Sequence, residues 1–182
     1  MRDRLEASSG LWLRRWTVRD AQSVLAAFAD PVMRYQVSEP VASLDAAYRW
    51  LTHQSDQWDS GEGFAFAAVD AMDVVLGNAA VRVVDQRHRT GWVSYWTTTT
   101  SRNKGIASKA CRSLARWSFD EPGLFRLELG HRINNPASCR VAKAAGFAVE
   151  GIERQKLEYD GVRFDVERHG RLATDTDPTM PV

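Results

Sequence analysis

The sequence predicts a mixed α/β (α+β) fold with about seven strands and about four helices. An aromatic strand at 90–97 runs into a polar loop and then into an amphipathic helix. A strictly alternating strand at 125–129 precedes a short helix that carries clear start and stop signals. The dipeptide Asp160-Gly161 separates two final strands and is a strong signal for a two-residue hairpin turn.

The size and composition indicate one globular domain, which we place at residues 1–172. A chain of 182 residues buries about 70% of its unfolded surface and can form a core without disulfides. The formal net charge of +1 demands no nucleic-acid partner. No segment approaches the roughly 20 apolar residues of a membrane span, and the charged N-terminus lacks the apolar run of a signal peptide. We therefore expect a cytoplasmic protein with a polar, disordered tail at 173–182.

The cysteine and histidine positions favour neither a disulfide nor a metal site. Cys111 and Cys139 both fall in predicted helices, which favours free thiols and a reducing compartment. The four histidines are scattered along the chain, at His53, His88, His131 and His169. Because their spacing matches no metal-ligand pattern, we expect no metal.

Hydrophobic periodicity assigns the other elements in chain order. Residues 1–10 are expected to form a loose leader, and 32–41 an irregular segment. The expected strands lie at 11–16, 64–69, 74–84, 90–97, 125–129, 149–159 and 162–172. The expected helices lie at 17–29, 43–60, 106–119 and 136–145.

The loop at 102–107, Arg-Asn-Lys-Gly-Ile-Ala, lies between the aromatic strand and the helix that follows it. The first N–H groups of a helix lack partners within it, and the helix dipole adds positive charge, so this place favours a phosphate. Gly105 allows close approach to the backbone, while Arg102 and Lys104 add formal charge. The alternative is a basic loop that caps an ordinary surface helix, and these six residues alone do not exclude it.

A second informative stretch runs from 134 to 147. Asn135 suits the N-cap of a helix, and Pro136 suits the first helical position because it has no N–H to lose. Gly146 suits the left-handed C-terminal position, with apolar Phe147 just after it. These signals leave Ser138 as the residue of this helix without an evident structural role.

Taken in order, these signals resemble the GNAT superfamily of acyl-CoA N-acyltransferases. The order is strand, Arg-x-x-Gly-x-Ala, helix, alternating strand, Asn-x-x-Ser helix, Gly-Phe and Asp-Gly hairpin. Within the superfamily the chain looks like the RimJ/RimL-like branch of ribosomal-protein N-terminal acetyltransferases. The resemblance covers about residues 11–172 and is most specific from Asn135 to Gly151. It implies a twisted, mostly antiparallel mixed sheet whose central strands splay apart to admit the pantetheine arm of acetyl-CoA.

The resemblance also implies a set of site residues. Backbone groups of Trp96 and Thr97 would pair with pantetheine amides, and the N–H near Thr97 would stabilise the oxyanion. Asn135 would bind the pantetheine arm and Ser138 would lie near the thioester sulfur, which makes these two the catalytic candidates. The pyrophosphate would lie on the loop residues Arg102, Asn103, Lys104, Gly105, Ile106 and Ala107.

Three positions depart from the family pattern. Many members carry a Tyr general acid where this chain has Ala142, so Ser138 is the substitute candidate, as in the RimJ/RimL-like branch. That branch commonly has Pro at the position of Thr99 and Glu at that of Lys109. An alternative role for Ser138 is a hydroxyl bonded back to the helix backbone.

The function that the resemblance implies is an N-acetyltransferase, which transfers acetyl from acetyl-CoA directly to a primary amine. The leading acceptor is a protein N-terminal amine, and a small amine such as an antibiotic or metabolite is the alternative. A non-catalytic acyl-CoA-binding module is an alternative of another class. An acyltransferase that uses aminoacyl-tRNA is a further one, which the basic helix face at Lys109, Arg112 and Arg116 supports.

The acceptor side has several candidates. Core packing is the more common role for aromatic residues such as Tyr35 and Trp92, and lining an acceptor pocket is the alternative for each. The candidate general bases are Glu39, Glu128, Glu153 and Asp165. The identity of the amine and the oligomeric state, including a homodimer, stay open at this point.

Overall fold

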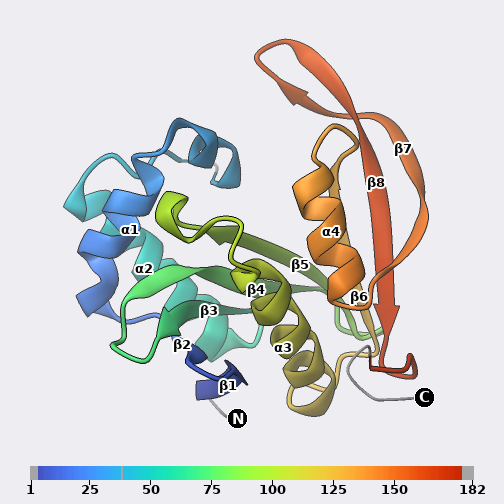
Figure 1. Ribbon diagram of the computed structural model, residues 1–182, viewed down its shortest axis with the longest axis horizontal. Coiled ribbons are helices and arrows are strands. Elements are labelled where there is room, and N and C mark those ends of the chain that lie inside the picture. Colours follow the sequence, from blue (N-terminus) through green and yellow to red (C-terminus); the bar gives the residue numbers. More distant parts are fainter. Residues whose placement is uncertain (1–3, 38, 178–182) are drawn as a thin grey trace.

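One mixed sheet with helices packed on it makes up the protein (Figure 1). The computed structural model describes residues 4–37 and 39–177. Its strands are β1 (Arg4–Ser8), β2 (Leu11–Arg15), β3 (Gly63–Asp70), β4 (Val75–Asp85), β5 (Thr90–Thr97), β6 (Arg126–Arg132), β7 (Ala148–Tyr159) and β8 (Val162–Leu172). Its α-helices are α1 (Ala21–Phe28), α2 (Leu44–Ser60), α3 (Ile106–Asp120) and α4 (Pro136–Ala144). Its short 3-10 helices are η1 (Val18–Asp20), η2 (Pro31–Gln36) and η3 (Thr99–Ser101).

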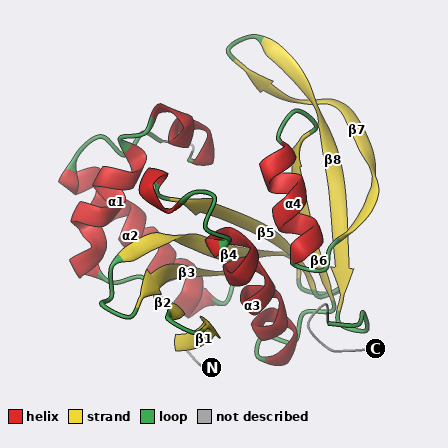
Figure 2. Ribbon diagram, in the orientation of Figure 1, coloured by secondary structure: helices red, strands yellow, loops and turns green. Residues whose placement is uncertain are grey.

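The sheet has the strand order β1-β2-β3-β4-β5-β6-β8-β7 (Figure 2). All neighbouring strands are antiparallel except β5 and β6, which are parallel. Because β8 lies between β6 and β7, the last strand of the chain enters the sheet interior. The prediction of a mixed, mostly antiparallel sheet with four α-helices is confirmed.

The first strand corrects the prediction of a loose leader. β1 pairs antiparallel with β2, with Leu5 opposite Leu13, and Leu5 and Ala7 pack against the core. The charged Arg4 and Glu6 alternate with these apolar residues, but the segment is too short to give a strong periodic signal. The sheet therefore has eight strands rather than about seven.

Strand β3 is buried on both faces and separates two hydrophobic cores. Phe66 packs on one face with Leu114 of α3. Ala67 packs on the other face with Val24 of α1 and Ala47 of α2. Because successive side chains of a strand point to opposite faces, one apolar run serves both helical layers.

The parallel pairing of β5 with β6 is short. It comprises Thr90↔Arg126, Gly91↔Leu127 and Trp92↔Glu128, and beyond these pairs the two strands separate. Side-chain packing is tight at Gly91, where an added Cβ would lie 2.6 Å from a methyl carbon of Val81 on β4 and 3.2 Å from one of Leu127 on β6. Glycine at this position thus leaves room for core side chains beside the paired part of the two strands.

Cys111 and Cys139 are both free. Among the described residues, no helix combines the length and apolar character needed to cross a membrane.

The tail differs from the expected disorder over residues 173–177. The Asp177 carboxylate accepts hydrogen bonds from Arg171, at 3.2 Å, and from Arg116 of α3. Because Arg171 is buried, its charge requires an anionic partner, and the tail supplies it. Residues 178–182 lie outside the described part of the chain.

Candidate active site

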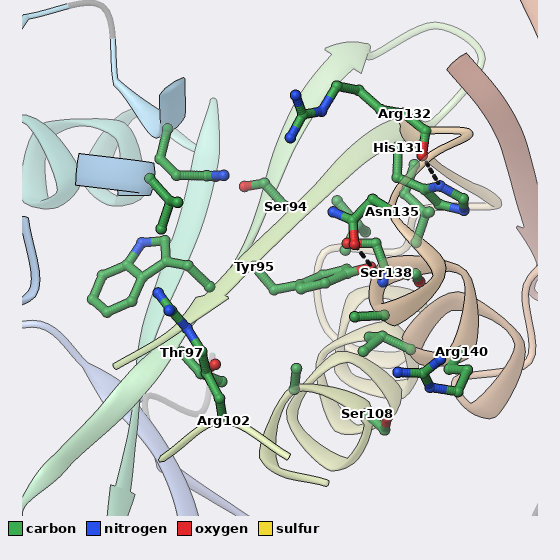
Figure 3. A pocket seen from close by; sticks show the side chains of 18 of the residues that line it. Ser94, Tyr95, Thr97, Arg102, Ser108, His131, Arg132, Asn135, Ser138 and Arg140 are labelled. Atoms are coloured by element: carbon green, nitrogen blue, oxygen red, sulfur yellow. Dashed lines mark hydrogen bonds between the residues drawn. The ribbon is translucent and has the colours of Figure 1, made fainter. Parts of the chain in front are cut away.

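A cleft of about 970 Å³ opens where β5 and β6 diverge (Figure 3). Its walls come from the ends of those strands and from the first turns of α3 and α4. Nine of the ten site residues predicted from the sequence line it, and Lys104 does not. The nine are Trp96, Thr97, Arg102, Asn103, Gly105, Ile106, Ala107, Asn135 and Ser138. A cavity of this size is typical of a small-molecule site.

The start of α3 leaves its backbone donors free. Gly105 is the N-cap and has φ of 72°, and Asn103 before it also has a positive φ, of 60°. By contrast, Ser43 caps α2 and Asn135 caps α4, each with a side-chain oxygen. No side chain caps α3 and no acidic residue lies in its first turn. The unpaired N–H groups and the helix dipole therefore leave positive potential at this edge of the cleft.

The two cations of the loop take different positions. Arg102 donates to Asp30 at 2.6 Å, and the Thr99 hydroxyl donates to the same carboxylate oxygen at 2.8 Å. These bonds, that of Thr99 above all, hold the pKa of Asp30 below its usual value. Arg102 thus ties the loop to the end of α1, while Lys104 is exposed to solvent.

The first turn of α4 is held from two sides. The Asn135 side-chain oxygen accepts from the Ser138 N–H at 3.2 Å, and Pro136 occupies the first helical position, as predicted (Figure 3). The Tyr95 hydroxyl donates to the Ser138 carbonyl at 3.1 Å. Burial raises the pKa of Tyr95 far above its ordinary value, so the phenol stays a neutral donor. The Ser138 hydroxyl forms no hydrogen bond with another described residue.

Strand β5 presents its two sides differently. The Trp96 ring lies in the hydrophobic core that also contains Val24 of α1 and Ala47 of α2. Its ring centroid is 5.9 Å from that of Trp16 and 5.8 Å from that of Phe28. Trp96 and Thr97 nevertheless both line the cleft. Tyr95 had no predicted role, because its partner on α4 lies 43 residues away in sequence.

The far end of the cleft is formed by segments distant in sequence. Tyr35 of η2 and Tyr159 of β7 pack with ring centroids 4.2 Å apart. The Tyr35 hydroxyl also donates to Asp160, at the hairpin tip, at 2.6 Å. Both tyrosines and Trp92 line the cleft, as suggested for Tyr35 and Trp92 from the sequence. No local pattern indicated Tyr159, which reaches η2 only through the long hairpin.

The charged side chains at the cleft are basic. Among the described lining residues, the cationic or titratable nitrogen groups belong to Arg102, His131, Arg132 and Arg140, and no Asp or Glu is present. The four carboxylates considered as general bases lie elsewhere. Glu128 pairs with Arg126 and Arg168, Glu153 pairs with Lys156, Asp165 accepts from the Gln155 N–H, and Glu39 is exposed.

An eight-stranded sheet with a splayed parallel pair and a cleft at two helix N-termini defines a class of acyl-transfer enzyme. Comparison with known proteins identifies it: residues 10–148 match the acetyltransferase (GNAT) domain family, and the chain belongs to that family. It is an N-acetyltransferase whose relatives are RimJ/RimL-like enzymes.

Several relatives can be named. The N-acetyltransferase YoaA of Bacillus subtilis is 26% identical over 158 residues, which are 85% of this chain and 89% of that one. The ribosomal-protein-serine acetyltransferase of Escherichia coli is 26% identical over 100 residues, 55% of this chain and 56% of that one.

Two solved structures share the fold. RimL, the ribosomal L7/L12 alpha-N-protein acetyltransferase in complex with coenzyme A, superposes with a TM-score of 0.84. It is 18% identical and covers 93% of this chain and 97% of its own. The microcin C7 self-immunity acetyltransferase MccE, in complex with acetyl-CoA and AMP, superposes with a TM-score of 0.82. It is 15% identical over 94% of this chain and 97% of its own.

The α4 cap can be tested by its effect on stability. Asn135→Ala should lower the free energy of unfolding by about 0.5–2 kcal/mol, because the Ser138 N–H loses its side-chain acceptor. Asn135→Asp keeps an acceptor oxygen, so its free energy of unfolding should remain within a few tenths of a kcal/mol of the wild-type value. Chemical denaturation of the three proteins measures both differences, and equal midpoints for Ala and wild type would contradict the cap.

Proposed function

We propose that this GNAT enzyme transfers the acetyl group of acetyl-CoA directly to a protein N-terminal amine in the cytoplasm. The observation that carries the proposal is one cleft shared by the uncapped N-terminus of α3, the free edge of β5 and Ser138 on α4. The name of the Escherichia coli relative, a ribosomal-protein-serine acetyltransferase, supports the choice of acceptor.

The donor would lie along the cleft in an extended form. Past Trp92, β5 has no strand partner on its β6 side, so its backbone groups there need hydrogen-bond partners. The amides of pantetheine supply such partners and would extend the sheet beside Trp96 and Thr97. The pyrophosphate would then meet the backbone N–H groups of residues 103–107 at the start of α3.

The reaction needs few side chains. A neutral amine attacks the thioester carbon, a backbone N–H near Thr97 stabilises the oxyanion, and the C–S bond breaks as the C–N bond becomes an amide. The amine loses its proton to solvent, and the coenzyme thiolate, of pKa about 8.5, leaves with little assistance. Ser138 would donate to that thiolate, with Asn135 holding the helix turn that presents it.

The basic lining of the cleft favours an α-amine as the acceptor. At pH 7.4 roughly a quarter of an N-terminal amine is neutral, whereas about one in a thousand lysine side chains is. No carboxylate among the described lining residues is available to deprotonate a lysine or to bind a polyamine. An N-terminal amine is therefore the acceptor that least requires a carboxylate in this site for deprotonation or binding.

The donor site can be tested with two variants at one position. Gly105→Asp should weaken acetyl-CoA binding at least tenfold, about 1.4 kcal/mol, because a carboxylate would face the pyrophosphate. Gly105→Asn is its neutral isostere, and both residues tolerate a positive φ and cap helices well. Calorimetric titration gives both affinities. Equal acetyl-CoA affinities of the Asp and Asn variants would show that the pyrophosphate does not bind at this loop.

The role of Ser138 can be tested by hydroxyl removal. Ser138→Ala should lower kcat by about tenfold with little change in acetyl-CoA affinity. This decrease is smaller than the roughly 10²–10⁴-fold typical of removing a general acid, because a thiolate leaves readily without protonation. Ser108→Ala, which removes a hydroxyl from α3 in the same cleft, is the matched control. Release of free coenzyme A measures the rates, and an unchanged kcat in Ser138→Ala would exclude the proposed role.

The acceptor can be tested with three amines. A peptide with a free N-terminal serine and no lysine should release coenzyme A faster than an N-blocked lysine peptide or spermidine, with kcat/KM rising towards pH 8 as the α-amine deprotonates. Faster release with spermidine would contradict an N-terminal acceptor. Binding of acetyl-CoA without release by any amine would favour the non-catalytic binding module.

A further inference from the structure

Four side chains that can bind metals meet beneath α4. They are His131 on β6, Cys139 on α4, and Glu167 and His169 on β8. Their ligand atoms, two imidazole nitrogens, a thiol sulfur and a carboxylate oxygen, all lie within 4.8 Å of one another. This cluster lies beside the cleft, and the proposed acetyl transfer uses none of its four members.

The pairing of β6 with β8 brings these residues to one face of the sheet. His131 pairs with Glu167, and Leu129 pairs with His169. Residues 129 and 131, like 167 and 169, point to the same side because side chains alternate along a strand. Helix α4 covers that side, and Cys139 approaches Glu167 at 3.4 Å.

The distances are close to those of a coordination shell. The Nε2 atoms of His131 and His169 are 3.0 Å apart. Glu167 Oε1 lies 2.9 Å from His169 Nε2 and 3.4 Å from His131 Nε2. Ligands placed tetrahedrally around zinc at roughly 2.0–2.3 Å are about 3.3–3.8 Å apart. The Cys139 sulfur lies 3.4 Å from Glu167 Oε1 and within 4.8 Å of the ligand nitrogens of both imidazoles, so coordination requires side-chain shifts of up to about an ångström.

The protonation of His131 suits coordination. A carbonyl can only accept, so the 3.0 Å contact of His131 Nδ1 with the Arg132 oxygen makes Nδ1 the donor (Figure 3). The Nε2 atom of neutral His131 therefore directs a lone pair into the cluster. A metal-binding histidine commonly donates its other N–H to a backbone carbonyl in this way.

Burial and charge also fit a divalent ion. His131 is 7% exposed and His169 is fully buried, so both rings are held away from solvent. An ionised Glu167 and a Cys139 thiolate together would neutralise a charge of two.

We propose that His131, Cys139, Glu167 and His169 bind one zinc ion. Imidazole, thiolate and carboxylate are its usual ligands, and four protein ligands are typical of a closed, structural site. The ion would join α4 to β6 and β8. Because Ser138 precedes Cys139, it would also hold the first turn of α4 in place beside the cleft.

Metal content of the tag-free, full-length protein tests the site directly. Wild type should contain about one zinc per chain by mass spectrometry, and Cys139→Ala should contain little. Cys111→Ala is the matched control, since Cys111 is a buried cysteine outside the cluster, and it should keep the zinc. A substoichiometric wild type that does not take up added zinc would overturn the proposal, as would a full zinc content in Cys139→Ala.

Cobalt gives a second readout that reports the ligands. Zinc-free wild type titrated with Co²⁺ should develop a thiolate-to-cobalt charge-transfer band, which Cys139→Ala should lack. Glu167→Gln preserves side-chain size and should weaken metal affinity by more than about tenfold. Circular dichroism checks that each variant is folded. If wild type shows no such band, the four groups form a hydrogen-bonded cluster only and the zinc proposal is wrong.

Discussion

Three residue pairs hold β5 against β6, and the rest of the structure depends on how soon that pairing ends. The ladder runs from Thr90↔Arg126 to Trp92↔Glu128. Within it, Gly91 leaves room for the side chains of Val81 and Leu127, which an added Cβ would meet at 2.6 and 3.2 Å. After it ends, the two strands diverge, the backbone edge of β5 is free on one side, and the cleft opens. A longer ladder would satisfy that edge within the sheet and leave no place for an extended donor.

The two helices that begin at this cleft differ in a way that divides their roles. Helix α4 is capped by its own Asn135 and tied to β5 through Tyr95, so hydrogen bonds hold its first turn at two points. Helix α3 begins at the left-handed Gly105 without a side-chain cap. Free backbone donors at one helix and a fixed hydroxyl-bearing turn at the other suit the phosphate end and the thioester end of one ligand. Formal charge contributes less than expected, because Arg102 is paired with Asp30.

The placement of β8 between β6 and β7 adds a second feature. It closes the far end of the cleft, because the β7–β8 hairpin carries Tyr159 to Tyr35. It also brings His169 beside His131 under α4. The same insertion thus shapes the far end of the cleft and gathers the polar cluster. If that cluster holds zinc, the turn that carries Ser138 is anchored by the ion as well as by its cap.

The sequence by itself determined the helices and most strands, because periodicity and capping are local. Asn135, Pro136 and Gly105 carried enough local information to locate both helix starts, and with the family resemblance they led to ten predicted site residues, of which nine line the cleft. Tertiary structure alone decided the rest. The short β1 joined the sheet because β2 offered an unpaired edge. The pairings of Tyr35 with Tyr159 and of His131 with His169 depend on strand order and register, and neither can be read from spacing along the chain.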